Sequence, residues 1–396
     1  MLQTRNALRR TRRRGAAVPL VAVSACVLIG MGAMAVDMGL IYRARVELQA
    51  AADAAALAAA VELLDVDRLK GTPNLTAEMD AARAKAAEYA AYNKVMKAAP
   101  TVDGNGSNSP DGDVVFGYLN NPDDLSEPLS FAQADRYNTV LVRVRRNQIR
   151  NGPIDLTFAA IFGIQTANLG AEAAATIKDG AVGFRVTPKT GNAGVLPLAL
   201  HVDAWKQFLA GTLSNGDNYS YNSATGAVTS GSDGIRELNL YPGSGTGNQL
   251  VTPGNFGTVD IGSPNNSTAD LSRQIRYGVN ADDLAYFGGE FKLGPDGTIA
   301  LNGDTGLSAA IKDDLESIKG QPRAIPLFSK VVGPGNNSTF TVVGFAGIRI
   351  VNVKLTGSMS SKQVLIQPAF VVDDTVITGP GSGSSSFVYE PVRLVR

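Results

Sequence analysis

The side chains that most often carry catalysis or bind metals are scarce in this sequence. His201 is the only histidine and Cys26 the only cysteine among 396 residues. One histidine excludes multi-histidine zinc sites and two-histidine iron sites, and one cysteine excludes an intramolecular disulfide. In LPLALHVDAW, we expect a structural role for His201 rather than a pocket beside Trp205. We predict no catalytic residue, no cofactor site and no metal site.

The acidic and glycine-rich motifs also indicate neither a metal site nor a phosphate site. The acidic residues of Asp111–Asp113 and of GPDGTIALNGDTG lack the spacing and closing glutamate of an EF-hand, so we interpret them as turns. The glycines of PGSGTGNQ precede a strand-like segment, whereas a phosphate site needs a helix N-terminus. If the protein were an enzyme, a carboxylate-based glycan hydrolase would fit best, because that chemistry needs neither histidine nor cysteine. We predict that it is not an enzyme.

The elements around these residues begin with an apolar run. Residues 16–36 contain no charge, and at about 1.5 Å per residue they are long enough to cross a bilayer core of about 30 Å. A cleaved signal peptide is the alternative, but its apolar region is usually shorter. Small residues such as Gly30 and Gly32 either permit close packing of another helix or simply make a weakly hydrophobic anchor. We predict an uncleaved transmembrane helix.

Charge sets the expected direction of this helix. The first fifteen residues contain six arginines and no acid. By the positive-inside bias, residues 1–15 form a cytoplasmic tail and everything after residue 36 is exported. The bias explains the arginines without nucleic acid, and we expect no nucleic-acid partner. Most of the chain is then expected outside the cytoplasm.

Beyond Asp37 the sequence continues as strong helix formers without proline, so we expect the membrane helix to extend as a stalk to about Lys70. Gly71-Thr72-Pro73 should end it. A second helix should run from an N-cap at Thr76 to about Ala98 and complete a helical hairpin.

The segment from Arg12 to Ala60 resembles the N-terminal segment of TadE/TadG-like proteins of the Flp (tight-adherence) pilus-assembly system. The resemblance rests on an apolar span followed by A-V-D-x-G and Y-x-x-R-x-x-L-Q-x-A-A-D-A-A-A-L-A-A-A. Residues 153–177 are similar to the end of the pilin-like part of that family. The resemblance implies a location in the bacterial inner (cytoplasmic) membrane, with most of the chain periplasmic or extracellular. It also implies contacts with other pilus-assembly or pilin-like proteins. Its candidate inter-subunit contacts in the stalk are Asp37, Tyr42, Arg45, Gln49 and Asp53, with ordinary solvated surface as the alternative.

Two departures from family patterns matter. Processed prepilins carry an acid five residues after the glycine at the cleavage point, but counting from Gly15 that position is Leu20. We therefore favour a TadG-like, membrane-retained member over a polymerising pilin. TadG-like proteins often carry a von Willebrand A domain with a D-x-S-x-S metal loop. The nearest match, Asp270–Gln274, has glutamine at the last position and is better explained as the first turn of a helix.

The remaining chain is rich in glycine and proline, with 43 and 19 residues respectively, and has many short strand-like segments. We expect an α+β fold: a transmembrane helix (16–36), a pilin-like region (37–180) with a helical stalk and a small antiparallel sheet, and a β-rich sandwich- or barrel-like domain (181–396). Short helices should interrupt that domain at 269–277 and 308–318.

These inferences predict a membrane-anchored component of a Tad/Flp-type pilus-assembly or envelope machine that acts by docking and anchoring. A homo-oligomer through the stalk helix is one form that this docking can take. Two alternatives remain open. One is a minor pilin within the filament, and the other is an envelope-anchored adhesin or glycan-binding module. In the second case the glycan would bind to a platform of exposed aromatic side chains on the C-terminal domain, namely Tyr219, Tyr221, Tyr241, Tyr277 and Tyr286.

Overall fold

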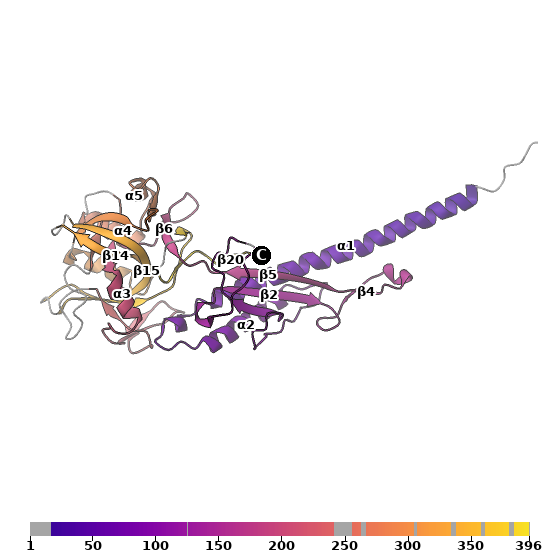
Figure 1. Ribbon diagram of the computed structural model, residues 1–396, viewed down its shortest axis with the longest axis horizontal. Helices are drawn as coiled ribbons and strands as arrows, with labels where there is room; N and C mark the ends of the chain where they lie inside the picture. Colours follow the sequence, from indigo (N-terminus) through magenta and orange to yellow (C-terminus); the bar gives the residue numbers. More distant parts are fainter. Residues whose placement is uncertain are drawn as a thin grey trace, which may run out of the picture. The chain divides into compact units, whose positions relative to one another are not determined.

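Figure 1 shows the computed structural model of the chain, which describes residues 17–124, 126–240, 256–262, 267–304, 307–333, 338–357, 361–379 and 384–395. The arginine-rich tail, Ala16, Tyr241 and the PGSGTGNQ motif lie outside the described residues.

The described helices include both α-helices and short 3-10 helices. The α-helices are α1 (Ala17–Glu62), α2 (Leu75–Tyr92), α3 (Val202–Leu209), α4 (Thr268–Tyr277), α5 (Ala281–Ala285) and α6 (Lys312–Ser317). The 3-10 helices are η1 (Val66–Leu69), η2 (Ala134–Arg136), η3 (Ala159–Phe162) and η4 (Ala309–Ile311).

The strands fall into several sheets. One sheet has the order β1 (Val114–Gly117), β2 (Thr139–Arg146), β5 (Leu169–Thr176) and β20 (Arg393–Leu394). The largest has the order β10 (Leu238–Asn239), β16 (Gln363–Pro368), β15 (Ser338–Lys354), β13 (Ile299–Asp304), β11 (Phe256–Val259), β7 (Leu198–His201) and β14 (Pro322–Val332). A three-stranded sheet joins β12 (Glu290–Lys292), β6 (Ala181–Arg185) and β18 (Val376–Thr378). Pairs are β3 (Ile154–Asp155) with β4 (Thr166–Ala167), β8 (Tyr219–Tyr221) with β9 (Val228–Ser230), and β17 (Val371–Val372) with β19 (Val388–Tyr389).

The chain divides into two compact units, each assembled from separate segments. Unit 1 contains the described residues up to Ala55 together with Ala86–Val115 and Leu141–Ala173. Unit 2 contains Ala56–Lys85, Phe116–Val140 and the described residues from Ala174 onward. This division by contacts differs from the linear division at residue 180 expected from the sequence, which stays a prediction.

Helix α1 is long because nothing in its sequence stops it. Pro19 lies in the first turn, where a missing N–H costs no hydrogen bond, and no other proline occurs before Glu62. The helix ends eight residues before the predicted end at Lys70. There the Asp65 side chain accepts a hydrogen bond from the backbone N–H of Asp67 at 2.7 Å and opens the 3-10 helix η1.

The second helix also differs from the prediction at both ends. Helix α2 begins at Leu75, because Asn74 rather than Thr76 caps it: the Asn74 Oδ1 accepts a hydrogen bond from the Ala77 N–H at 3.2 Å. It ends at Tyr92 rather than near Ala98. The Asn93 side chain donates to the Tyr89 carbonyl, and Met96 and Lys97 then adopt positive φ angles, which no helix accommodates.

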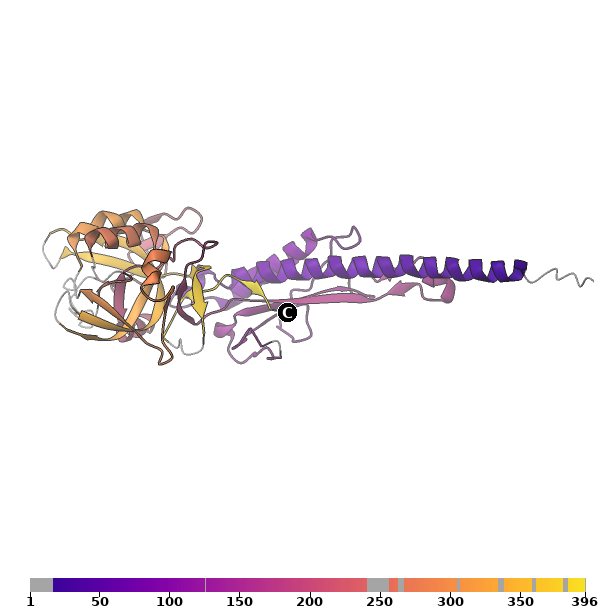
Figure 2. The same cartoon turned by 90° about the horizontal axis from the view of Figure 1, so that it is seen from above.

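The C-terminal β-rich region forms a closed five-stranded barrel, which resolves the expected choice between sandwich and barrel. Strand β15 pairs with both β13 and β14, and β7 pairs antiparallel with β11 and parallel with β14, so the ring β14-β15-β13-β11-β7 closes. Beyond the ring, β16 and β10 extend the sheet from β15. Helix α3 packs on β14 and β7, and α6 packs on β15. Figure 2 shows these helices beside the curved strands.

Strand alternation sends successive side chains of the barrel into two hydrophobic clusters. In β7, Leu198 and Leu200 belong to the cluster that also holds Trp205 of α3, whereas Ala199 faces the other. The second cluster is rich in phenylalanine, with Phe328 and Phe340 in an edge-to-face pair at 4.9 Å between ring centroids.

Candidate functional site

A polar junction lies at the end of the apolar part of α1, within unit 1. The carboxylate of Asp37 accepts hydrogen bonds from three consecutive backbone N–H groups, those of Thr157, Phe158 and Ala159, at 2.8, 2.9 and 2.6 Å. These groups open the 3-10 helix η3 and have no partner within it. Only 5% of Asp37 is exposed. The carboxylate therefore holds the segment around η3 against α1.

That segment, residues 156–164 with the sequence LTFAAIFGI, is called the apolar tip below. It connects β3 to β4, and Figures 1 and 2 both show it alongside α1. The tip and the helix enclose an apolar groove of about 400 Å³. The lining includes Val27, Met31, Met34 and Ile41 of α1 and Phe158 and Phe162 of the tip. Much of the tip remains uncovered, since Ile161 and Phe162 are 78% and 79% exposed.

Two further contacts attach α1 to the rest of unit 1. The Gln49 side chain donates to the Glu172 carbonyl of β5 at 3.0 Å, and the Glu47 carboxylate accepts from the Met96 N–H at 2.6 Å. Fully buried alanines, among them Ala44, Ala51, Ala52 and Ala55, give this part of the helix a surface that packs closely.

The structure separates the five predicted contact residues into two groups. Asp37 is buried and used within unit 1. Tyr42, Arg45 and Gln49 are exposed, and Asp53 is half-buried. At three- and four-residue steps these four residues lie on one side of α1, and we call them the stalk stripe. Gln49 donates to Asp53 at 2.8 Å, whereas Tyr42 and Arg45 make no hydrogen bond or ion pair with any residue in the described ranges.

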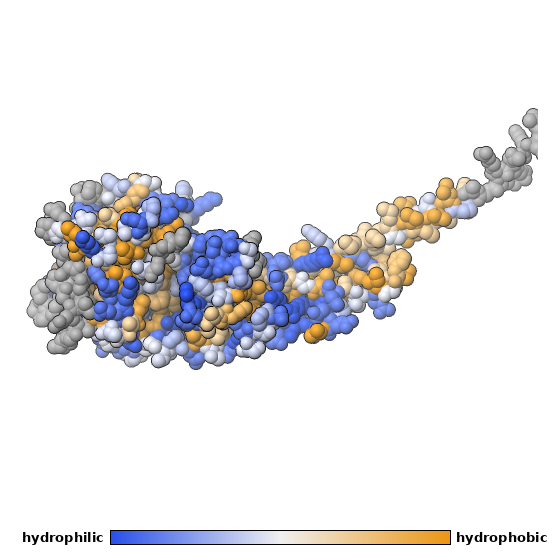
Figure 3. All heavy atoms as spheres, in the orientation of Figure 1, coloured by the Kyte–Doolittle hydropathy of each residue, from blue (hydrophilic) through white to orange (hydrophobic). Residues whose placement is uncertain are grey.

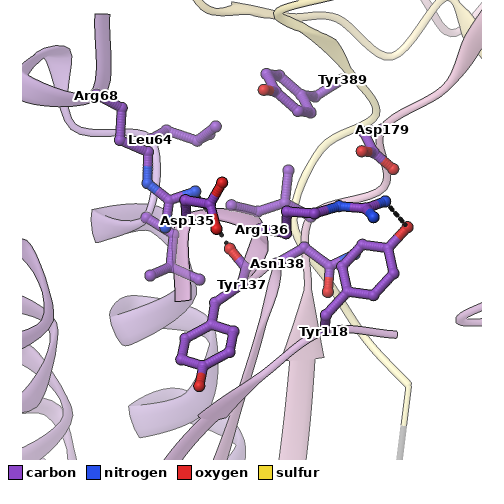
Figure 4. A pocket seen from close by; sticks show the side chains of 11 residues that line it. Leu64, Arg68, Tyr118, Asp135, Arg136, Tyr137, Asn138, Asp179 and Tyr389 are labelled. Carbon is purple, nitrogen blue, oxygen red and sulfur yellow. Dashed lines mark hydrogen bonds between the residues drawn. The ribbon is translucent and has the colours of Figure 1, made fainter. Parts of the chain in front are cut away.

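Unit 2 contains a polar pocket of about 170 Å³, shown in Figure 4. Arg136 lies over the Tyr118 ring at 4.6 Å and donates to its hydroxyl, and Figure 4 shows its guanidinium directed toward Asp179. The pocket walls desolvate the Asp179 carboxyl and raise its pKa, although much of this residue is exposed. Burial, and next the charge of Asp179, raise the pKa of the Tyr389 hydroxyl. The volume is below the range of about 300–1,000 Å³ typical of ligand pockets.

One wall of this pocket depends on a buried ion pair. Arg68 Nε donates to both carboxylate oxygens of Glu78 at 2.8 and 2.7 Å, and its Nη1 donates to the Tyr137 carbonyl. Burial raises the pKa of Glu78, and the hydrogen bonds from Arg68 oppose that shift. The pair joins η1 to α2.

The motifs weighed in the sequence have structural roles. His201 caps α3, with Nδ1 accepting from the Asp203 N–H at 3.2 Å. Asp270 lies in the first turn of α4, which Ser267 caps, so the helix-start interpretation is confirmed. Asp296 forms a turn by accepting from the Thr298 N–H. Among the described residues, no cluster of three or more acidic, histidine or cysteine side chains could hold a metal ion.

The tyrosines proposed for glycan binding differ in their exposure to solvent. Tyr221 stacks under the buried Arg349 guanidinium at 3.8 Å, and Tyr219 is half-buried. Tyr277 and Tyr286 are exposed. Glycan binding stays a prediction.

Within the described residues, α1 is the one helix long and apolar enough to cross a membrane. A chain of this kind, with one such helix continued by folded units, fits the class of single-pass membrane-anchored proteins. Two family models match its N-terminal part. A model described as putative Flp pilus-assembly TadE/G-like matches residues 15–62, and one described as putative Tad-like Flp pilus-assembly matches residues 58–175. Over residues 15–175 the chain is therefore similar to these pilus-assembly families. Neither the curated proteins nor the solved structures gave a match.

The apolar tip was missed as a functional element at the level of sequence. Its signal is a run of nine residues, 156–164, in which Thr157 is the one polar side chain. An apolar run this short is typical of a buried strand or helix segment, so the pattern does not predict a position beside the apolar end of α1.

Proposed function

We propose that this protein is a non-enzymatic component of a Tad/Flp-type pilus-assembly machine, anchored in the bacterial inner membrane by α1. Its N-terminus lies in the cytoplasm and the folded units lie on the other side. It acts by docking other proteins of the machine, or a second copy of itself, on the stalk directly beyond the anchor. This retained, TadG-like role differs from that of a polymerising pilin subunit.

The observation that carries the proposal is the stalk stripe. It begins five residues after Asp37, so it lies at the membrane surface if residues 17–36 span the bilayer. Tyr42 is 72% exposed, and neither it nor Arg45 has a polar partner in the described ranges. Tyrosine and arginine are enriched in the centres of protein interfaces, because each combines a large apolar area with hydrogen-bonding capacity.

The first test is the mass and N-terminal sequence of the protein from native membranes, together with its presence in sheared pili. An intact N-terminus with the protein confined to membranes supports the anchored role. A start at Ala16 with the protein in the filament would replace that role with a minor pilin, despite Leu20.

A further inference from the structure

We propose that the apolar tip is a second membrane contact, which inserts beside α1 into the outer half of the bilayer and binds lipid acyl chains. The inference uses the membrane-spanning role of α1 and adds a lipid-binding site that the anchor alone does not require.

The apolar groove lies along the part of α1 that is predicted to span the membrane. Its lining extends along α1 from Ile41 back to Val27, which lies nine residues before Val36, the last residue of the predicted span. At about 1.5 Å per residue this is roughly 14 Å into a hydrocarbon core of about 30 Å. If residues 17–36 cross the bilayer, the groove reaches from the membrane surface into the outer leaflet, so the tip that lines it comes within reach of acyl chains.

The surface of the tip is suited to that depth. Ile161, Phe162 and Ile164 are exposed over 78%, 79% and 57% of their surface, and residues 156–164 carry no charge. Figure 3 shows apolar residues over this region of α1 and the tip. An apolar cluster of this kind on a soluble surface would be unfavourable, whereas acyl chains cover it without cost to any polar group.

Most backbone N–H groups of the tip meet a stricter condition. Non-helical backbone at membrane depth must satisfy its polar groups within the protein, since hydrocarbon offers no hydrogen bonds. Seven of the nine tip N–H groups donate to protein acceptors: those of residues 157, 158 and 159 to Asp37, and those of residues 156, 161, 163 and 164 to carbonyls within or next to the tip. Asp37 thus supplies acceptors at the one place where η3 has none of its own.

Depth-dependent fluorescence quenching tests the proposal on the full chain. The wild type, labelled with an environment-sensitive probe at Cys26, reports the anchor. Cys26→Ser/Ile164→Cys and Cys26→Ser/Phe162→Cys report the tip. Cys26→Ser/Ile149→Cys is the matched control, because Ile149 is an isoleucine of the same unit that is 90% exposed and lies outside the groove. Each labelled protein is reconstituted into phosphatidylcholine/phosphatidylglycerol vesicles with doxyl-labelled lipid or with iodide on both sides.

We expect doxyl lipid to quench the probes at positions 26, 162 and 164, and iodide to quench those probes at least fivefold less than the probe at position 149. Quenching of the tip probes like the position-149 probe, with position 26 still in lipid, would overturn the tip contact and leave the anchor intact. Loss of lipid quenching at position 26 would overturn both. Protection of the tip from iodide without lipid quenching would show that a protein surface covers it, and would also overturn the proposal.

Discussion

The Asp37 carboxylate accepts a hydrogen bond from the Ala159 backbone N–H at 2.6 Å, although 122 residues separate them in the chain. With the N–H groups of Thr157 and Phe158, this contact fixes the start of η3 on α1. A carboxylate is a strong acceptor for such groups, and hydrogen bonds to charged groups contribute about 1.5–3 kcal/mol each. The junction is the best-defined polar link between the apolar end of α1 and the rest of unit 1.

Replacing Asp37 should therefore loosen the tip. We expect Asp37→Ala to accelerate amide hydrogen exchange of residues 157–159 at least about tenfold, which corresponds to about 1.4 kcal/mol of local opening free energy. Asp37→Asn should have a smaller effect, because one neutral acceptor oxygen remains. Exchange is measured by mass spectrometry on the full chain in detergent. Asp155→Asn is the control, since Asp155 is exposed and next to the tip. Equal exchange in all three variants would contradict the structural role of Asp37.

The stalk stripe makes a prediction about partners. Arg45→Glu combined with Asp53→Lys keeps the net charge and reverses both signs, so the protein should stay in the membrane while losing proteins that co-purify with it. We expect at least about a fivefold loss from native membranes, because a misplaced charge at an interface costs several kcal/mol. Asp203→Lys with Lys206→Glu reverses two exposed charges on α3 and serves as the control. Unchanged co-purification in the stripe variant would rule out docking through Arg45 and Asp53.

The buried Arg68–Glu78 pair makes a prediction about pH. Removing the arginine leaves a carboxylate whose side chain is only 2% exposed, so Arg68→Ala should destabilise the fold by about 3–5 kcal/mol near pH 7. The variant also loses the hydrogen bonds that lower the pKa of Glu78, so this pKa should rise further. A carboxyl with a raised folded pKa binds its proton more tightly in the folded state. Stability then falls as pH rises from the unfolded value of about 4.3 to the folded pKa.

The loss of unfolding free energy in Arg68→Ala should therefore be smaller at pH 5 than at pH 7.5. Thermal unfolding of the full chain in detergent at the two pH values measures it. The double variant Arg68→Met/Glu78→Met should be closer to wild type in stability than Arg68→Ala and should lose the added pH dependence. A deficit that is the same at both pH values would show that Glu78 is not the titrating group.

Two glycines provide a matched pair for packing in unit 2. A Cβ on Gly347 of β15 would approach the carbonyl oxygens of Ala369 and Phe387 to 2.3 Å, whereas a Cβ on Gly191 would meet nothing within 4 Å. Gly347→Ala should destabilise by at least about 1–3 kcal/mol, the usual range for overpacking, and Gly191→Ala should stay within about 0.5 kcal/mol of wild type. The thermal midpoints of the two variants give the comparison. Equal midpoints would show that the chain at residues 369 and 387 can move away from β15.

Local patterns in the sequence predicted elements well and their partners poorly. Alternating and β-branched residues are typical of the strands β2, β14 and β15, and the strong helix formers beyond Asp37 predict α1. Closure of the barrel was not predictable, because it depends on the parallel pairing of Leu200 with Leu327, far apart in the chain. Helix α3 was missed since it is short and is capped by His201, a residue outside the usual capping set.

For the candidate site, too, the sequence indicated residues but not their contacts. The family motif identified Asp37 and the stalk stripe as residues of interest, but it could not separate a buried acceptor from an exposed surface. That distinction depends on residues 157–159, which meet Asp37 only after the intervening chain has folded. Conversely, the tip lies within residues 153–177, whose resemblance to the family does not indicate a membrane contact. Only its position beside α1 indicates one.

The pairing of β20 with β5 has a consequence for the order of events in the cell. Arg393 pairs with Thr176, and the whole barrel lies between them in the sequence. If the chain is exported from its N-terminus onward, β5 emerges long before its last partner. The edge of that sheet then stays open until the barrel and residues 393–394 have crossed the membrane. Export of the barrel would thus precede completion of this sheet, and a chaperone that shields a lone strand edge would be most useful in that interval.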